Sequence, residues 1–256
     1  MERLNKNTNK KYIFIGKCLF FPKEKILVVG DLHLGYETAL RTRGLEFPVN
    51  QFQEMQEELE KTILHIKARF GKIAEIIFLG DVKHHFGFIG EEKEELTKLL
   101  RFLRKYVENE NRIIFIKGNH EKNEKSGKFI DYYIVKDIAF VHGNKEFLEA
   151  YDKKINLVVM GHIHPSVVLS DKMKIKREKY KCFLVGRYKK KEFVVLPSFL
   201  NIAEGVSSSE FSSADFDEDE IDFSIVPQAE LKDFEVFVCG EIGEEALGFG
   251  KLGKIS

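Results

Sequence analysis

The chain has 256 residues, of which 43% are hydrophobic and 32% are charged, and its formal net charge at pH 7 is zero. This length can bury a large core, and we expect one domain over residues 1–256. No apolar stretch approaches the ~20 residues of a membrane span, and the N-terminus lacks the apolar core of a signal peptide, so we expect a cytoplasmic protein without a membrane partner. The three cysteines lie far apart in the sequence, which fits a reducing compartment.

Five apolar runs have the composition of buried strands. They are continuous, rich in β-branched and aromatic residues, and lack polar alternation, which is typical of strands buried on both faces. In chain order they cover residues 26–29, 76–79, 113–116, 138–141 and 157–160. Glycine follows three of these runs directly, at positions 30, 80 and 161, and a fourth run after one residue, at position 118. At these positions the chain can turn sharply and ligands can approach closely.

Two stretches between the runs have helical spacing. Apolar residues recur every three or four positions in residues 49–70 and in residues 91–108. Each stretch joins one predicted strand to the next, and this β-α-β alternation predicts a sheet with parallel strands and helices outside it. Further along, residues 181–186 and 192–197 favour a strand pair, and residues 234–240 favour a last strand, followed by a glycine-rich end made of turns.

Metal-binding side chains follow each of the five runs. The five patches are Gly30-Asp31-Leu32-His33, Gly80-Asp81-Val82-Lys83-His84, Gly118-Asn119-His120-Glu121, Val141-His142-Gly143 and Gly161-His162-Ile163-His164. Open α/β sheets place their chemistry at the carboxyl ends of the strands, so we expect the patches to meet. The mixture of carboxylate, amide and imidazole donors suits Mn, Fe, Zn or Co and does not suit a thiolate site.

A pair of divalent ions needs a shared ligand. In two-metal sites the ions lie about 3.5–4 Å apart, and one carboxylate can bridge them while a hydroxide between them is poised for in-line attack on phosphorus. Asp81, which follows a central strand, is our candidate for the bridge. A single Asp-x-His after a strand is more often a polar turn, but five patches together favour a two-metal phosphoesterase site.

In this order, the patches resemble the calcineurin-like metallophosphoesterase superfamily, whose pattern is D-x-H, G-D, G-N-H-[DE], H and G-H-x-H. The resemblance spans residues 31–164 and implies an α/β fold, a four-layer α-β-β-α sandwich with two sheets face to face. The segment 80–84 resembles the G-D-hydrophobic-x-H variant of double-strand-break repair nucleases. Segment 30–35, with Arg41, Arg43, Gly44 and Pro48 after it, is similar to small SbcD-related phosphoesterases of archaea and ligase-associated endonucleases of bacteria.

The resemblance also implies roles for the matching residues. One metal ion would be held by Asp31, His33, Asp81 and His164, and the other by Asp81, Asn119, His142 and His162. His120 would stabilise the developing charge and protonate the leaving oxygen as a general acid. Glu121 would orient His120, and His84 would act near the substrate. We expect two Mn²⁺ ions, with Fe, Zn, Co or Ni as alternatives.

Other polar residues have two interpretations each. Arg41 and Arg43 could each grip a phosphate with two parallel hydrogen bonds, or could be solvated loop charges. His85 is better explained as a loop residue, and His65 as a structural residue on a helix.

Two segments have an unusual charge. We call residues 172–191 the basic ribbon, because lysines and arginines there alternate with Tyr180, Phe183 and Tyr188. It could follow a phosphate backbone and stack on bases, or it could be a hairpin with a solvated face and a lysine-rich turn. Residues 207–222 are serine-rich and then acidic, which predicts a mobile loop within the domain.

These features lead to a leading hypothesis and two alternatives. The first is a two-metal-dependent phosphodiesterase that acts as a nuclease on DNA, with a metal-bridging hydroxide as nucleophile and His120 as general acid. The alternatives are a phosphodiesterase or phosphatase acting on a small or cyclic nucleotide, and a catalytically silent subunit that binds nucleic acid. Nucleic acid is the expected partner, and a homodimer is compatible with the sequence. We expect no obligate ATPase partner, because little sequence follows the catalytic core to hold a capping domain.

Overall fold

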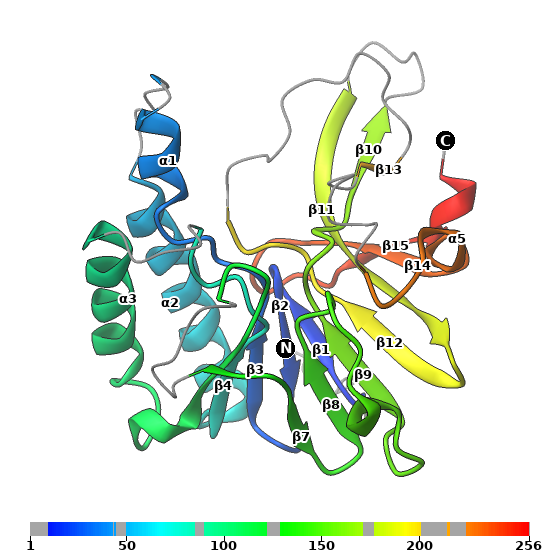
Figure 1. The fold of residues 1–256 in the computed structure, drawn as a ribbon, viewed down its shortest axis with the longest axis horizontal. Coiled ribbons are helices and arrows are strands. Elements are labelled where there is room, and N and C mark those ends of the chain that lie inside the picture. Colours follow the sequence, from blue (N-terminus) through cyan, green and yellow to red (C-terminus); the bar gives the residue numbers. More distant parts are fainter. Residues whose placement is uncertain are drawn as a thin grey trace, which may run out of the picture.

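The computed structural model describes residues 10–42, 44, 50–84, 90–121, 129–170, 177–200, 214–215 and 224–255. Two β-sheets pack face to face, with long helices over the outer face of the first sheet and short helical segments over the outer face of the second (Figure 1). These are the layers of the expected α-β-β-α sandwich. None of the described helices is long and apolar enough to cross a bilayer.

The first sheet has six strands in sequential order. They are β1 (Ile13–Ile15), β2 (Cys18–Phe21), β3 (Ile26–Val29), β4 (Glu75–Phe78), β5 (Ile113–Ile116) and β6 (Phe129–Ile130). β1, β2 and β3 pair antiparallel, whereas β3 to β6 are parallel. Parallel strands share one direction, so the carboxyl ends of β3, β4 and β5 come to the same edge of the sheet.

The second sheet is mixed and has the order β13-β10-β11-β12-β9-β8-β7, with β14 paired to β11 and β15 paired to β14. Its strands are β7 (Tyr133–Val135), β8 (Ile138–Val141), β9 (Leu157–Met160), β10 (Ser166–Ser170), β11 (Arg177–Tyr188), β12 (Lys191–Val195), β13 (Ala214–Asp215), β14 (Glu235–Val238) and β15 (Leu247–Lys251). β8, β9 and β12 are parallel. β8 and β9 therefore deliver the segments that follow them to one edge.

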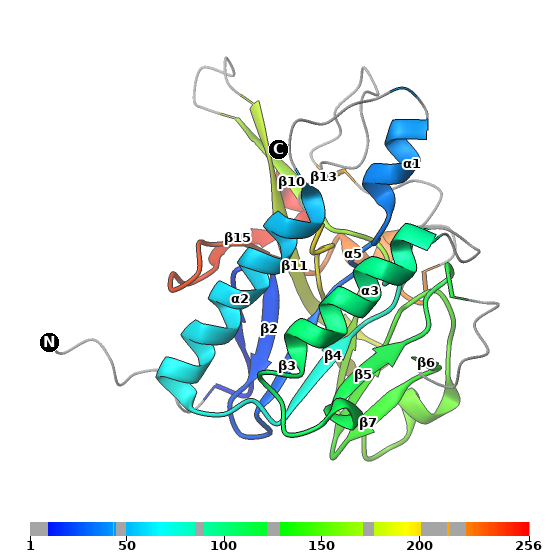
Figure 2. The same ribbon diagram turned by 90° about the vertical axis from the view of Figure 1, so that its left-hand side faces the viewer.

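The described residues include α-helices and shorter 3₁₀ helices. They are α1 (Tyr36–Thr42), α2 (Gln51–Phe70), α3 (Gly90–Leu103) and α5 (Gln228–Leu231), with 3₁₀ helices η1 (Glu110–Arg112), η2 (Leu148–Tyr151) and η3 (Leu252–Lys254). α2 begins where the side chain of Asn50 accepts the backbone N–H of Gln53, and it ends at Gly71, whose φ of 82° suits glycine. α2 and α3 lie over the first sheet (Figure 2).

Three apolar clusters hold the layers together. One lies between the sheets and includes Phe21 and Phe140, whose rings meet edge to face with centroids 5.8 Å apart. A second joins the first sheet to the buried faces of α2 and α3, and a third joins the second sheet to α5 and η3. Because aromatic and branched side chains are buried on both faces of each sheet, the strand ends are held rigidly.

Most of the predicted elements are confirmed. The five apolar runs form β3, β4, β5, β8 and β9, and the predicted strand pair corresponds to β11 and β12, with β12 ending at Val195. The prediction that the glycine-rich end is made of turns was wrong, because residues 247–251 form β15. Glycines at positions 248 and 250 weaken the local strand signal, and pairing with β14 outweighs it.

Two predictions about loops fall on residues that the structure does not describe. Within the acidic segment 207–222, only residues 214–215 are described, and as β13 they pair with β10. The remainder of that segment, together with Arg43 and His85, lies outside the described residues.

Candidate active site

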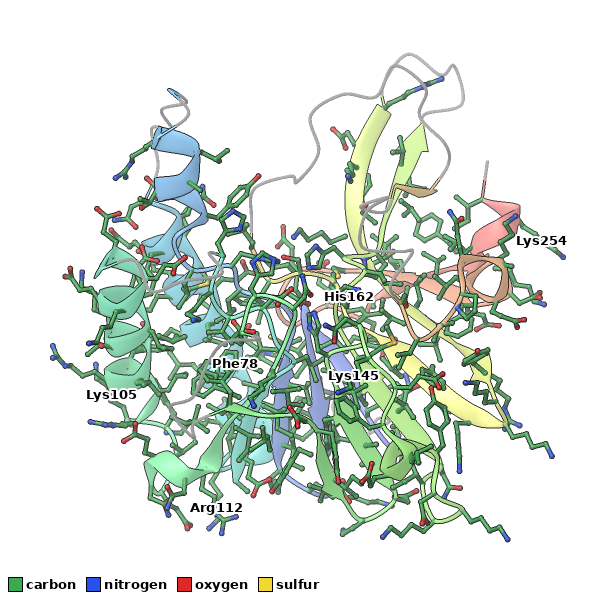
Figure 3. All side chains as sticks on the ribbon, viewed as in Figure 1. Phe78, Lys105, Arg112, Lys145, His162 and Lys254 are labelled. Atoms are coloured by element: carbon green, nitrogen blue, oxygen red, sulfur yellow. The ribbon has the colours of Figure 1, made fainter. Side chains whose placement is uncertain are left out.

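The five patches meet at one edge, where strand ends of both sheets come together. Figure 3 shows His162, which follows β9, at this edge among other imidazole rings. The side chains at this edge form two groups of possible metal ligands. Within each group, the donor atoms all lie within 4.8 Å of one another. One group is Asp31, His33 and His164, and the other is Asp81, His142 and His162. The edge therefore brings six of the predicted ligands into two clusters, each able to hold an ion.

Asn119 completes the second group through His142. Its Oδ1 atom lies 2.9 Å from Nε2 of His142, and Oδ2 of Asp81 lies 3.3 Å from the same nitrogen. The backbone carbonyl of Leu79 lies 2.9 Å from Nδ1 of His142. A carbonyl can only accept, so Nδ1 carries a hydrogen and Nε2 is the atom presented to Asp81 and Asn119. A backbone carbonyl commonly fixes a metal-binding histidine in this way.

The two groups are in contact. Oδ1 of Asp31 lies 3.3 Å from Nδ1 of His142 and 3.7 Å from Nε2 of His164. Nε2 of His33 lies 3.3 Å from Nε2 of His164. Two ions held in these groups would therefore be close neighbours, as a two-metal centre requires. Which residue binds which ion, and whether Asp81 bridges them, stays a prediction.

The backbone at the ligands is strained. Positive φ angles of 48°, 41°, 76° and 43° occur at His33, Asp81, His162 and His164. Side-chain-bearing residues rarely adopt this region, and such residues cluster at functional sites, where the surrounding structure holds them. The backbone at these four predicted ligands is therefore held in a strained conformation at the point where the patches meet.

Glycines make room for the ligands, as predicted. A Cβ atom at Gly118 would lie 2.0 Å from Oδ1 of Asp81, and one at Gly161 would lie 2.4 Å from Oδ2 of Asp31. A Cβ atom at Gly80, whose φ is 110°, would lie 2.5 Å from Nδ1 of His142. No real Cβ approaches another atom so closely, so larger residues at these positions would displace the ligands.

Burial and neighbouring charges shift the pKa values of the ligands. Burial disfavours the charged form of His142, but Asp81 and then Asp31 raise its pKa to about 9. Burial, with His142 as the second cause, lowers the pKa of His162 to about 3. Burial raises the pKa of Asp31, but His164 and His142 outweigh it and hold that pKa below the usual value. His162 is thus neutral and Asp31 ionised, the forms that bind metal ions.

The donor set fits two divalent cations. Oδ1 of Asp31, Oδ2 of Asp81 and both ring nitrogens of His162 are buried and have no hydrogen-bond partner in the described part of the chain. Buried polar atoms without partners are costly, and clusters of them call for a ligand. Bound cations would satisfy these atoms, and the mixed oxygen and nitrogen donors suit divalent transition metals.

His120 and His84 lie beside the first group. Donor atoms of His33, His84 and His120 form a third group within 4.8 Å. The backbone N–H of His120 donates to Oδ1 of Asp81 at 3.0 Å, and its ring Nδ1 is hydrogen-bonded to the backbone carbonyl of His84. Nδ1 therefore carries a hydrogen, and Nε2, which lies 3.9 Å from Oδ2 of Asp81, faces the site.

Glu121 ties together the two loops that carry Asp81 and His120. Its carboxylate is fully buried and accepts the backbone N–H groups of Asp81, Lys83 and Gly118, at 3.0, 3.0 and 2.9 Å. Glu121 thus joins the loop after β4 to the loop after β5. The ring of His120 is hydrogen-bonded to the backbone carbonyl of His84, and orientation of that ring by Glu121 stays a prediction.

Arg41 is engaged away from the metal groups. Its guanidinium pairs with Glu37, one helical turn earlier in α1, and its side chain is 55% exposed. In the structure Arg41 is thus a solvent-exposed charge paired within its own helix. A contact between Arg41 and substrate stays a prediction.

Tyr36 is a site residue that sequence reasoning missed. It begins α1 directly after the first patch, and its ring packs edge to face on His84, with centroids 4.8 Å apart. No spacing rule singles it out, because its contact with His84 joins segments that are distant in the sequence.

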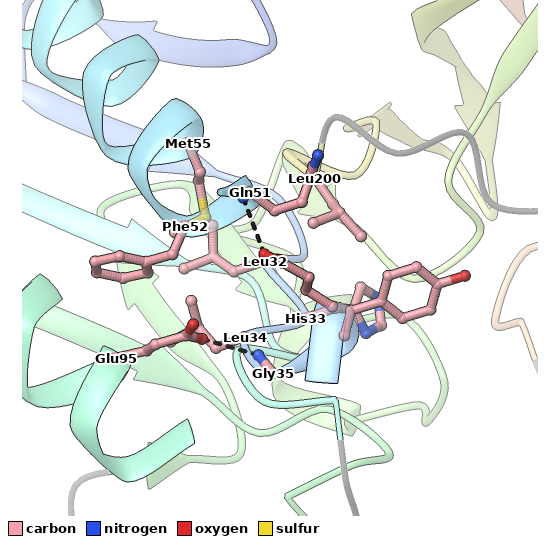
Figure 4. Close-up of a pocket in the computed structure, with 11 residues that line it drawn as sticks. Leu32, His33, Leu34, Gly35, Gln51, Phe52, Met55, Glu95 and Leu200 are labelled. Atoms are coloured by element: carbon pink, nitrogen blue, oxygen red, sulfur yellow. Dashed lines mark hydrogen bonds between the residues drawn. The ribbon is translucent and has the colours of Figure 1, made fainter. Parts of the chain in front are cut away.

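A small pocket lies behind the loop that carries His33 (Figure 4). The carboxylate of Glu95 accepts the backbone N–H of Gly35 at 2.9 Å, and the carboxylate of Glu37 accepts that of Gln51 at 3.1 Å. Burial raises the pKa of Glu95. The first contact ties the loop to α3, and the second ties α1 to α2, so the pocket belongs to the support of the site.

Comparisons with known proteins agree with this geometry. The family described as calcineurin-like phosphoesterase matches residues 24–186, which is more than half of the chain and contains all five patches. Among solved structures, Pseudomonas putida nuclease MPE is similar in fold, with a TM-score of 0.55 and 17% sequence identity over 90% of this chain and 92% of that chain.

Two further structures match more weakly. Wild type Vps29 from Entamoeba histolytica complexed with zinc has a TM-score of 0.37 and 14% identity, over 88% of this chain and 99% of that chain. A predicted phosphoesterase from Streptococcus pneumoniae TIGR4 has a TM-score of 0.35 and 12% identity, over 88% and 97%. No curated protein sequence matches. The family implies hydrolysis of phosphoesters at a site with two divalent metal ions, and by the match over residues 24–186 this chain belongs to the calcineurin-like phosphoesterase family.

Proposed function

We propose that this protein is a metal-dependent phosphodiesterase that cleaves nucleic acid, with DNA as the expected substrate. The observation that carries the proposal is the position of His120 beside two groups of metal-binding side chains, with Nε2 turned toward them. Two divalent cations, with Mn²⁺ expected, would activate water and neutralise charge on the phosphate. A catalytically silent subunit would not need a histidine oriented in this way.

The residues of the chain have separate tasks in this proposal. The carboxylates and imidazoles of the two groups hold the cations. His120 presents Nε2 to the leaving oxygen and gives it a proton, while the hydrogen bond from Nδ1 to the carbonyl of His84 keeps the ring in place. The ring of His84 lies 5.6 Å from that of His120, measured between centroids, and would contact the phosphate.

The length and position of the hairpin β10–β11 favour a long substrate. β10 begins two residues after His164, and α1 and the β10–β11 hairpin project from the same side of the molecule in both views (Figures 1 and 2). Ser170 pairs with Arg177 at the outer end of the hairpin. At ~3.3 Å per residue, this pair lies roughly 20 Å along the chain from His164, the length of several nucleotides.

The outer part of the hairpin has the side chains that nucleic acid requires. Arg177, Lys179 and Tyr180 are exposed on β11, and Tyr180 exposes 37% of its surface. Cationic side chains neutralise phosphates, and an aromatic ring can stack on a base. The similarity in fold to Pseudomonas putida nuclease MPE supports the same substrate class.

The other end of the basic ribbon serves the fold. Lys189 pairs with Glu146, and Lys191 donates to the backbone carbonyls of Asp152 and Ile155 at 2.7 and 2.6 Å. These lysines lie at the far end of β11 from the residues that pair with β10. We therefore assign phosphate contacts to the hairpin end only.

A charge-reversal experiment tests this assignment. We would compare Arg177→Glu/Lys179→Glu with Lys189→Glu/Lys190→Glu, a control pair with the same change of charge, in the cleavage of a labelled oligonucleotide by the Mn-loaded protein. The hairpin variant should raise KM and flatten its salt dependence, because fewer counterions are released. The control should leave the salt slope unchanged. Equal effects in both variants would contradict the assignment, and cleavage of small diesters alone would contradict the proposed substrate.

A further inference from the structure

β15 is an apolar edge of the second sheet. All of its residues, Leu247–Lys251, are exposed, and Leu247 and Phe249 expose 61% and 41% of their surfaces. Among the described residues, β15 pairs with β14 alone, so its outer edge presents backbone N–H and C=O groups to a further strand. Figure 2 shows the β14–β15 hairpin projecting from the body of the molecule.

The middle of β15 has neither charge nor proline. Edge strands in soluble proteins commonly carry charges, proline or a β-bulge, each of which hinders pairing with another chain. Of these, β15 has only a bulge in its pairing with β14, at Phe249 between Gly248 and Gly250. The glycines leave space for a second backbone, and the exposed ring offers area that a partner strand could bury.

The charges around β15 are self-complementary. Glu244 and Glu245 precede the strand, whereas Lys251 and Lys254 lie at and after its end. If a second copy paired antiparallel with β15, the acidic end of each copy would meet the basic end of the other. Parallel pairing would instead bring like charges together. Opposite charges across neighbouring strands attract, and like charges destabilise the pair.

The exposed side chains fit the same arrangement. A partner strand would cover Leu247 and Phe249 of each copy and bring Glu245 near the partner's Lys251. Removing apolar side chains from water stabilises such a contact. In one copy Lys251 pairs with Asp233 at 2.8 Å, with 48% and 77% of the two side chains exposed. Exposed ion pairs are weak, so this one does not prevent a contact with the partner.

We propose that two copies of this protein associate through antiparallel pairing of β15, which joins their second sheets into one continuous sheet. The contact is symmetric, because the same strand is used by both copies, as in most homodimers. The hairpin that carries it is built from β14 and β15 and contains none of the five patches. Dimer formation and catalysis can therefore be measured separately.

Sedimentation equilibrium of the full chain over a range of concentrations tests the association. The wild-type protein should reach a dimer, and Phe249→Lys should raise the dissociation constant by about tenfold or more, which corresponds to ~1.4 kcal/mol. Leu148→Lys is the matched control, because Leu148 is 88% exposed on η2 and lies outside β15. Circular dichroism and the melting temperature show that each variant is folded.

Charge exchange identifies the strand and its direction. Glu244→Lys/Glu245→Lys alone and Lys251→Glu/Lys254→Glu alone should each weaken the dimer, because like charges then meet at both ends. An equimolar mixture of the two variants should restore a heterodimer. A wild-type protein that stays monomeric would overturn the proposal. So would a dimer that Phe249→Lys leaves intact, or a mixture that gains nothing over its components.

Discussion

The ring Nδ1–H of His120 donates a hydrogen bond to the backbone carbonyl of His84. This contact joins the patch after β5 to the patch after β4 and determines which nitrogen of His120 faces the metal groups. It places a group that can donate a proton beside the donor atoms that would hold the phosphate.

His120→Ala should retain bound metal but lose about 10²–10⁴ in kcat, the usual contribution of a general acid. The loss should be larger for an ester with a poor leaving group, since such a group needs the proton more. Metal content by mass spectrometry and kcat on two esters measure both effects. His65→Ala, on α2, is a control that should change neither. Full activity of His120→Ala on the poor leaving group would assign the proton to another residue.

Asp81→Asn should abolish the binding of two metal ions per chain and, with it, turnover. The amide has the shape of the carboxylate but no charge, so the cations would lose an anionic ligand. The carboxylate that is replaced lies 3.3 Å from Nε2 of His142 and 3.9 Å from Nε2 of His120. Calorimetric titration with Mn²⁺ measures the stoichiometry. Asp137→Asn, at a side chain that is 38% exposed, is the matched control. Two ions bound to Asp81→Asn would exclude Asp81 as the bridge.

Glu121→Gln should lower the free energy of unfolding by about 1–3 kcal/mol, the cost of leaving a buried donor unsatisfied. The glutamine amide has one acceptor oxygen, whereas the carboxylate of Glu121 uses both oxygens to accept three backbone N–H groups. Urea unfolding measures the change. If Glu121 instead served only to orient His120, the variant would lose kcat and keep its stability.

Metal removal should lower the melting temperature. The two groups present buried donors that a cation satisfies only in the folded state, and a ligand at 100 times its dissociation constant stabilises a protein by ~2.7 kcal/mol. A melt in chelator, followed by melts at rising Mn²⁺, measures the shift. The shift should be absent in Asp81→Asn, and a shift of equal size in that variant would show that Mn²⁺ acts elsewhere.

Tyr36→Ala should raise KM for an oligonucleotide and leave turnover of a small phosphodiester unchanged. The ring lies next to His84 and can stack on a base near the cleaved bond, a contact worth about 1–3 kcal/mol. Tyr36→Phe keeps the aromatic face and should behave like the wild type. Loss of activity on both substrates would show that Tyr36 supports His84 and does not bind the base.

The sequence predicted the strands well because each apolar run is buried on both faces, as with Val28 in β3 and Val159 in β9, and local composition records that burial. It also predicted the meeting of the patches, because parallel strands deliver their ends to one edge. The protruding part of β11 and the edge strand β15 were missed. Both consist of exposed residues, and both are held by backbone pairing with the strand that precedes them, which residue types do not record.

The details of the site depended on contacts between distant segments. The carbonyl of Leu79 that orients His142, and the carbonyl of His84 that orients His120, belong to the backbone and leave no mark in residue types. The same holds for the three backbone N–H groups that Glu121 accepts. Residue types therefore indicated which side chains gather, while the directions of those side chains came from the fold.

Hydrolysis by the Mn-loaded protein, measured side by side on labelled oligonucleotides and on a panel of small cyclic nucleotides, distinguishes a nuclease from an enzyme that acts on small nucleotides. We predict cleavage of the oligonucleotides that is lost in Asp81→Asn and falls by about 10²–10⁴ in His120→Ala. Turnover of the small diesters alone would contradict the nuclease proposal while keeping the family activity. No turnover of any substrate by a protein with two bound metal ions would contradict the catalytic account as a whole.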